Sequence, residues 1–139
     1  MQSYSKVIIK MNDILNKNII VIDDHTTMVR IIVKLMQEVG FKKIDTATDG
    51  KEALGLIAEK DYSLIVSDWN MEPMSGLELL KKVRANARTA SIPFIMVTAE
   101  SKPTNVLAAK EAGVTNYIVK PFTAATMKHK LESIFGDLD

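Results

Sequence analysis

The chain contains no cysteine, only four prolines and six glycines, and few aromatic side chains among its 139 residues. Without cysteine it can form no disulfide, no thiolate nucleophile and no cysteine-ligated metal site. Its two histidines, His25 and His129, are too far apart in the sequence to match the spacing of a zinc motif. The groups left for chemistry are carboxylates, hydroxyls and amines.

Long hydrophobic runs and an excess of one charge are also missing. No segment reaches the about 18 to 20 apolar residues of a membrane span, and the run Val7–Ile9 is too short for the core of a signal peptide. Lys and Arg number 18 against 17 Asp and Glu, for a net charge of +1. This balance argues against general binding to nucleic acids or membrane surfaces. We expect a cytoplasmic protein.

Apolar runs alternate with amphipathic segments along a chain whose length suits one domain. The strands that we expect are Asn18–Ile22, Lys43–Ala47, Leu64–Asp68, Phe94–Val97 and Asn116–Val119. The helices that we expect are Met28–Val39, Lys51–Lys60, Gly76–Ala87, Pro103–Ala112 and Thr123–Phe135. Such alternation predicts an α/β fold, in which helices cover both faces of a parallel sheet.

Capping residues and turn residues set the expected boundaries. Thr26 or Thr27 can cap the first helix, and the pair Asp49-Gly50 is typical of a turn. Residues 1–17 show no clear periodicity, so we expect an N-terminal extension that is partly ordered at best. Residues 18–139 then form the domain.

Polar side chains follow four of the expected strands at the point where each strand ends. Asp23 and Asp24 follow the first strand, Asp68 the third, Thr98 the fourth and Lys120 the fifth. Because the carboxyl ends of parallel strands meet at one edge of the sheet, we expect these side chains to converge there. Three carboxylates held together require a cation, and oxygen ligands favour Mg²⁺.

Asp68 is the best candidate for a nucleophile at this edge, because a carboxylate can itself accept a phosphoryl group. Lys120 offers a flexible positive charge suited to phosphoryl oxygens, and Thr98 offers a hydroxyl donor. Each feature alone is more often a turn or a helix cap. Their occurrence in this order, each at the end of a strand, favours a functional site.

At this point the chain resembles the receiver domain of two-component response regulators, from Ile19 to about Phe135. The stretches that carry the resemblance are Val21–Asp24, Asp49-Gly50, Ser67–Met71, Gly76–Leu80, Met96–Glu100 and Val119–Thr126. The pair Trp69-Asn70 and the run Lys120–Thr126 resemble the chemotaxis response regulators of the CheY type. The resemblance implies a flavodoxin-like, doubly wound sheet of five parallel strands in the order 2-1-3-4-5.

The resemblance also implies the central chemistry. Asp68 would accept a phosphoryl group from the phosphohistidine of a histidine kinase. Asp23, Asp24, Asp68 and the backbone carbonyl of Asn70 would hold Mg²⁺. His25, which follows the acidic pair, is expected to be a solvated loop residue without a catalytic role.

Further roles follow from the same resemblance. Lys120 would pair with the phosphoryl oxygens, and Thr98 would move to bind them. Tyr117 would then swing inward and change the face formed by the last two helices and the last strand. Asn70 and Glu100 would control the access of water to the acyl phosphate, which is short-lived in the chemotaxis type. The peptide bond before Pro121 is expected to be cis.

These inferences predict a stand-alone response regulator, a phosphoacceptor signalling protein rather than an enzyme with an external substrate. The expected partners are a chemotaxis sensor histidine kinase and the flagellar motor switch, with a phosphatase as a further candidate. The alternative is a phosphorelay intermediate or phosphate sink that exchanges its phosphoryl group with a histidine phosphotransfer protein. We expect a monomer that binds neither nucleic acid nor membrane.

Two functions of other classes are disfavoured. A haloacid-dehalogenase-type phosphatase would need a second acid two residues after its nucleophile, where this chain has Asn70. A flavin binder of the same fold is disfavoured because the acidic strand ends would repel a phosphate in the absence of Mg²⁺.

Overall fold

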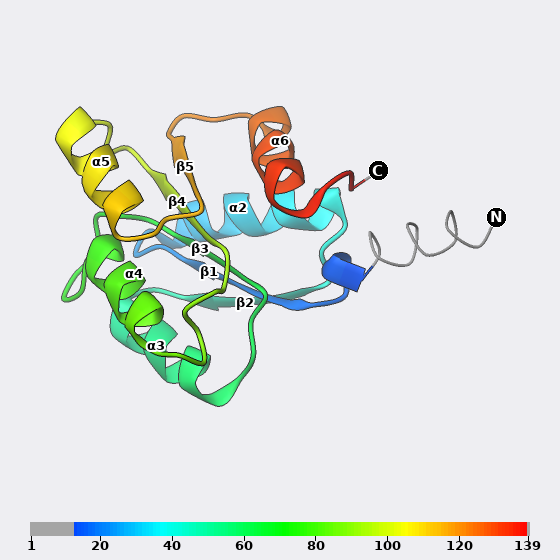
Figure 1. Ribbon diagram of the computed structural model, residues 1–139. Helices are drawn as coiled ribbons and strands as arrows, with labels where there is room; N and C mark the ends of the chain where they lie inside the picture. The colour runs from blue at the N-terminus through cyan, green and yellow to red at the C-terminus, as the bar shows by residue number, and fades with distance from the viewer. Residues whose placement is uncertain (1–12, 139) are drawn as a thin grey trace.

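Within residues 13–138, which the computed structural model describes, five parallel strands form one central sheet (Figure 1). The strands are β1 (Asn18–Ile22), β2 (Lys43–Ala47), β3 (Leu64–Ser67), β4 (Phe94–Thr98) and β5 (Asn116–Val119). They lie in the order β2-β1-β3-β4-β5, and all four pairings are parallel. The predicted flavodoxin-like topology is therefore confirmed. Most of the expected N-terminal extension, residues 1–12, lies outside the described residues.

The helices that follow the strands are α2 (Thr26–Val39), α3 (Gly50–Glu59), α4 (Gly76–Ala85), α5 (Pro103–Glu111) and α6 (Ala124–Phe135). Helices α2 and α6 cover one face of the sheet, while α3 and α4 cover the other, with α5 beside β5 (Figure 1). Among the described helices, none is long and apolar enough to cross a bilayer.

The strands are continuously apolar because both faces of the sheet are covered. In β1, Ile19 and Val21 pack against α2 and α6, whereas Ile20 and Ile22 pack against α3 and α4. All four side chains are fully buried. Burial of a side chain of this size contributes roughly 1.5–3 kcal/mol, so the centre of the sheet is a rigid base for the residues at its edge.

The first helix begins differently from the prediction. Neither Thr26 nor Thr27 is the cap, because α2 starts at Thr26 and His25 is the N-cap residue, without a side-chain capping bond. The physical reason is the preceding carboxylate: Asp23 Oδ1 accepts the backbone N–H of His25 at 2.9 Å. This bond turns the chain into the helix before either threonine.

The pair Asp49-Gly50 is part of a helix start rather than a separate turn. The Asp49 side chain accepts the backbone N–H of Glu52 at 2.7 Å and caps α3, whose first residue is Gly50. Met74 packs directly against Gly50, so the loop after β3 contacts the start of α3. An aspartate followed by glycine fits both a turn and an N-cap, and tertiary packing selects the cap here.

Other boundaries differ by one or two residues. Strand β3 ends at Ser67, so Asp68 lies just beyond the strand rather than within it. Helix α4 ends at Ala85 instead of Ala87, because Asn86 is extended, with φ −98° and ψ 123°, and its side chain accepts the backbone N–H of Arg88. The sheet and the order of its elements are unaffected.

Candidate functional site

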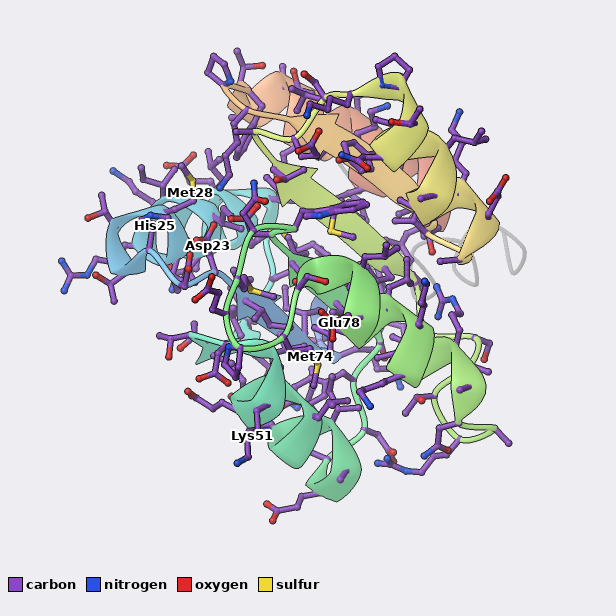
Figure 2. All side chains as sticks on the ribbon, turned by 90° about the vertical axis from the view of Figure 1, so that its left-hand side faces the viewer. Asp23, His25, Met28, Lys51, Met74 and Glu78 are labelled. Atoms are coloured by element: carbon purple, nitrogen blue, oxygen red, sulfur yellow. The ribbon has the colours of Figure 1, made fainter. Side chains whose placement is uncertain are left out.

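The carboxyl ends of the strands meet at one edge of the sheet, and the predicted polar residues lie there. Figure 2 looks onto this edge, with Asp23 and His25 before α2 and with Met74 and Glu78 around the start of α4. The side chains of Asp23 and Asp68 are almost entirely buried, whereas that of Asp24 is 36% exposed. This edge of the sheet, hereafter the acidic edge, therefore holds two buried carboxylates, Asp23 and Asp68, and one carboxylate open to solvent, Asp24.

Four residues of this edge can offer ligand atoms to one ion. Asp23, Asp24, His25 and Asp68 place candidate ligand atoms that all lie within 4.8 Å of one another. Three of the four are carboxylates, which are the hard oxygen donors that Mg²⁺ prefers. The donor set therefore fits the predicted magnesium ion.

Lys120 bridges two of the carboxylates. Its Nζ lies 2.9 Å from Asp23 Oδ2 and 3.7 Å from Asp68 Oδ2, and its side chain is only 16% exposed. One ammonium group offsets one of the three carboxylate charges of Asp23, Asp24 and Asp68. The two remaining negative charges match a divalent cation, which would reduce the electrostatic cost of keeping the carboxylates together.

Thr98 and Tyr117 both bind the backbone of Glu100. Thr98 is fully buried, and its Oγ1 accepts the N–H of Glu100 at 3.2 Å. The hydroxyl of Tyr117 donates to the carbonyl of Glu100 at 2.8 Å. Burial raises the pKa of Tyr117 to about 12, and the negative charges of Glu100 and Asp68 add to the increase. The two predicted switch residues are thus connected through one residue of the loop after β4.

The carboxylate of Glu100 is exposed and binds residues that follow it in the chain. It accepts the backbone N–H of Lys102 at 3.0 Å. Hydrogen bonds from the Asn105 side chain and from Lys102 hold the pKa of Glu100 below its ordinary value. This carboxylate is therefore ionised and locally anchored at the entrance to α5.

Asn70 lies in the loop between Asp68 and α4. It lines a hollow of about 340 Å³, together with Asp24, Trp69, Met71, Glu72 and Ser75. The hollow adjoins the exposed carboxylate of Asp24, so solvent and small solutes can approach the acidic edge from this side. The role that the sequence predicts for Asn70 stays a prediction.

His25 was expected to be a solvated loop residue without a catalytic role. Its side chain is 74% exposed, but Nδ1 lies 2.9 Å from Asp24 Oδ1 and 3.3 Å from Asp23 Oδ1. This contact was not predicted. Its position directly after two carboxylates was the available signal, because the backbone must reverse there to enter α2.

The cis peptide bond predicted between Lys120 and Pro121 is present. A second cis bond, between Glu72 and Pro73, was not predicted.

Comparison with known proteins gives a consistent result. The response regulator receiver domain family matches residues 19–132. The chemotaxis protein CheY-3 of Vibrio cholerae is 46% identical over 130 residues, which cover 92% of this chain and 100% of CheY-3. The chemotaxis protein CheY of Pseudomonas aeruginosa is 44% identical over 117 residues, covering 84% of this chain and 94% of that protein.

Solved structures show the same relationship. The chemotaxis response regulator CheY4 of Vibrio cholerae superposes with a TM-score of 0.79 at 30% identity, covering 86% of this chain and 98% of CheY4. The receiver domain of a Pseudomonas aeruginosa sensor histidine kinase has a TM-score of 0.79 at 21% identity, covering 88% of this chain and 99% of that domain. At 21% identity, the similarity to the receiver domain of the histidine kinase shows a shared fold alone.

Proposed function

The chain belongs to the response regulator receiver domain family, and we propose that Asp68 is the residue that accepts a phosphoryl group from a histidine kinase. The observation that carries this proposal is the position of Lys120, whose Nζ lies between the carboxylates of Asp23 and Asp68. A largely buried cation beside one carboxylate of an acidic cluster suits an incoming phosphoryl group, which brings further negative oxygens. The similarity of this chain to CheY proteins supports a receiver function.

In the proposed reaction, a carboxylate oxygen of Asp68 attacks the phosphorus atom of the donor's phosphohistidine. An O–P bond forms as the N–P bond breaks, and the electron pair of that bond returns to the imidazole nitrogen. Lys120 then pairs with the phosphoryl oxygens, and the Thr98 hydroxyl donates to one of them. Thr98 ends β4 and Lys120 follows β5, and these two strands are neighbours. Both side chains can therefore stabilise the phosphoryl charge with little backbone movement.

We propose that Asp23, Asp24, Asp68 and the backbone carbonyl of Asn70 hold Mg²⁺. The cluster of carboxylate oxygens supports the first three residues. When bound, the ion neutralises carboxylate charge and polarises phosphoryl oxygens. Without the ion, Lys120 would offset only one of the three carboxylate charges, and two negative charges would remain uncompensated at a largely buried site.

We further propose that phosphorylation changes the face formed by α5, β5 and α6. If Thr98 moves toward the phosphoryl group, its bond to the Glu100 N–H must change, and Tyr117 is bound to the same residue. Val119 is a large apolar side chain exposed on this face, and Val106 of α5 lies beside it. A groove of about 380 Å³ lies between α5, β5 and α6, and Tyr117 lines it. These features support a binding face that is sensitive to the position of Tyr117.

The proposed pathway is chemotaxis. Two relatives that are 46% and 44% identical are chemotaxis proteins, and their similarity extends over most of both chains. We propose a chemotaxis histidine kinase as donor and the flagellar motor switch as the partner in the cytoplasm, with a phosphatase acting on the acyl phosphate. The second candidate is exchange of the phosphoryl group with a histidine phosphotransfer protein, or a phosphate sink.

We propose residues 18–139 as the receiver domain and residues 1–17 as an extension before it. The start of β1 at Asn18 and the family match over residues 19–132 support this division.

The experiment is a binding titration with a peptide from the N-terminus of a motor switch protein. Beryllofluoride with Mg²⁺ serves as the phosphoryl mimic, and Asp68→Asn is the control. Tighter binding only in the presence of the mimic, lost in Asp68→Asn, supports both the switch and the chemotaxis output. A Trp69 fluorescence response without peptide binding would favour the phosphotransfer alternative. No response to the mimic would contradict the proposal.

A further inference from the structure

The peptide group that joins Asp68 to Trp69 is bound at both of its polar atoms. Its N–H donates to Asp68 Oδ1 at 2.7 Å, and its carbonyl oxygen accepts from the Ser67 hydroxyl at 2.9 Å. In a planar trans peptide the N–H and the C=O point in opposite directions. The Ser67 hydroxyl therefore fixes the direction in which the N–H points, which is toward the carboxylate of Asp68.

Ser67 differs from the rest of its strand. Leu64, Ile65 and Val66 are fully buried apolar residues, whereas Ser67 brings a hydroxyl into the same core at 1% exposure. A buried hydroxyl requires a hydrogen-bond partner, and Ser67 finds one in the carbonyl of Asp68. The polar residue at the end of this strand thus has a specific partner, the peptide group that follows the phosphoacceptor.

Gly76, the first residue of α4, lies directly against the same peptide group. A side chain at this position would collide with the Asp68 carbonyl oxygen, and its Cβ would lie 2.9 Å from the Asp68 carbonyl carbon and from the Trp69 Cα. The Gly76 N–H donates to the Trp69 carbonyl at 2.8 Å. Glycine therefore lets α4 lie directly against this backbone. The carbonyl oxygen of Asp68 therefore lies against both the Ser67 hydroxyl and the start of α4.

The two oxygens of the Asp68 carboxylate consequently have different environments. Oδ1 accepts the short hydrogen bond from the Trp69 N–H, whereas Oδ2 lies 3.7 Å from Lys120 Nζ. A lone pair engaged in a hydrogen bond is less available for attack, and Lys120 is the cation that would receive the phosphoryl oxygens. This arrangement favours Oδ2 as the attacking oxygen.

We propose that Ser67 is a positioning residue, which orients the Asp68–Trp69 peptide so that Oδ1 is held and Oδ2 is presented toward Lys120. This inference rests on the proposed function of Asp68 as the phosphoacceptor. Gly76 supports the same orientation, because glycine lets the start of α4 pack against the Asp68 carbonyl.

The test compares two variants that each remove one buried hydroxyl. Ser67→Ala removes the bond to Asp68. Thr89→Val is the matched control, because Thr89 is also buried and its hydroxyl donates to the Val83 carbonyl at 2.7 Å, away from the acidic edge. The rate of phosphorylation by phosphoramidate is followed by intact-mass spectrometry over a range of donor concentrations at saturating Mg²⁺. The folded fraction of each variant is measured by circular dichroism.

We expect Ser67→Ala to lower the maximal rate constant about tenfold, with the half-saturating donor concentration unchanged, because the buried Ser67 hydroxyl orients the Asp68 peptide and cannot reach the donor. Thr89→Val should keep the wild-type rate constant, although its thermal stability should fall by about as much as that of Ser67→Ala. A wild-type rate in Ser67→Ala would overturn the inference, as would an equal loss in both variants. If the wild-type chain is not phosphorylated at all, the proposed function itself fails.

Discussion

The phenol hydroxyl of Tyr117 donates a hydrogen bond of 2.8 Å to the backbone carbonyl of Glu100. The N–H of Glu100 donates in turn to the hydroxyl of Thr98, which lies at the acidic edge. Two hydrogen bonds through one residue therefore connect the edge of the sheet to an aromatic side chain on β5. We propose that this connection couples events at Asp68 to the face of α5, β5 and α6.

Tyr117 makes stability depend on pH in the alkaline range. Burial raises the pKa of its hydroxyl from the ordinary value of 10.0 to about 12. The unfolded chain then loses this proton at a lower pH than the folded chain, so the contribution to stability is complete below pH 10 and is lost as pH rises toward 12. Denaturant unfolding between these values should show a smaller loss of stability in Tyr117→Phe than in wild type. An identical loss in both proteins would contradict the prediction.

Removal of the Lys120 charge should affect magnesium binding and phosphorylation in opposite directions. Lys120→Gln leaves Asp23 and Asp68 without their ammonium partner, so a divalent cation is attracted more strongly. We expect Mg²⁺, measured by isothermal titration calorimetry, to bind several-fold more tightly while phosphorylation slows by at least about 100-fold. Without Mg²⁺ the variant should be less stable by about 3 kcal/mol, because a buried carboxylate loses its partner.

The exposed Lys110 is a suitable control, because it lies on α5 and Lys110→Gln removes the same charge far from the carboxylates. Weaker magnesium binding in Lys120→Gln than in Lys110→Gln would argue against the proposed electrostatics.

The start of α4 depends on a capping box. The Ser75 hydroxyl accepts the N–H of Glu78 at 3.1 Å, and the Glu78 carboxylate accepts the N–H of Ser75 at 3.5 Å. Ser75→Ala should therefore lower the free energy of unfolding by about 1 kcal/mol. Ser101→Ala, at an exposed residue outside a helix, should change it by less than about 0.5 kcal/mol. Equal values for the two variants in urea denaturation would show that the box does not stabilise α4.

The acyl phosphate should be short-lived. Asn70 lies in the loop after Asp68, and Glu100 follows β4, the two positions that we propose control the approach of water. After the donor is removed, the phosphorylated fraction should decay within minutes in the presence of Mg²⁺. Replacement of either residue should change the decay rate without preventing phosphorylation. Persistence of the wild-type phosphoryl group for many hours would refute this expectation.

The sequence predicted the sheet well, because its strands are short apolar runs that end in polar residues. The bounds of β1, β2 and β5 agree with the structure, and the parallel order brings Asp23, Asp68 and Lys120 to one edge as expected. Helix starts were less accurate, because a local hydrogen bond such as that from the His25 N–H to Asp23 decides the first turn.

Contacts that depend on close approach could not be predicted. Nothing in the order of residues indicates that Gly76 lies against the Asp68 carbonyl or that the Ser67 hydroxyl binds the same oxygen. Both relationships arise only when α4 packs against the end of β3. The contact of His25 with two carboxylates is different, because its position directly after them in the sequence was a signal that the prediction did not use.

The most direct test of the central claim is the intact mass of the protein after incubation with phosphoramidate and Mg²⁺. The wild-type chain should gain the mass of one phosphoryl group, and chelation of Mg²⁺ before the donor is added should prevent the gain. Asp68→Asn should gain nothing under the same conditions. A phosphoryl group on Asp68→Asn, or none on the wild-type chain, would contradict the assignment of Asp68 as the phosphoacceptor.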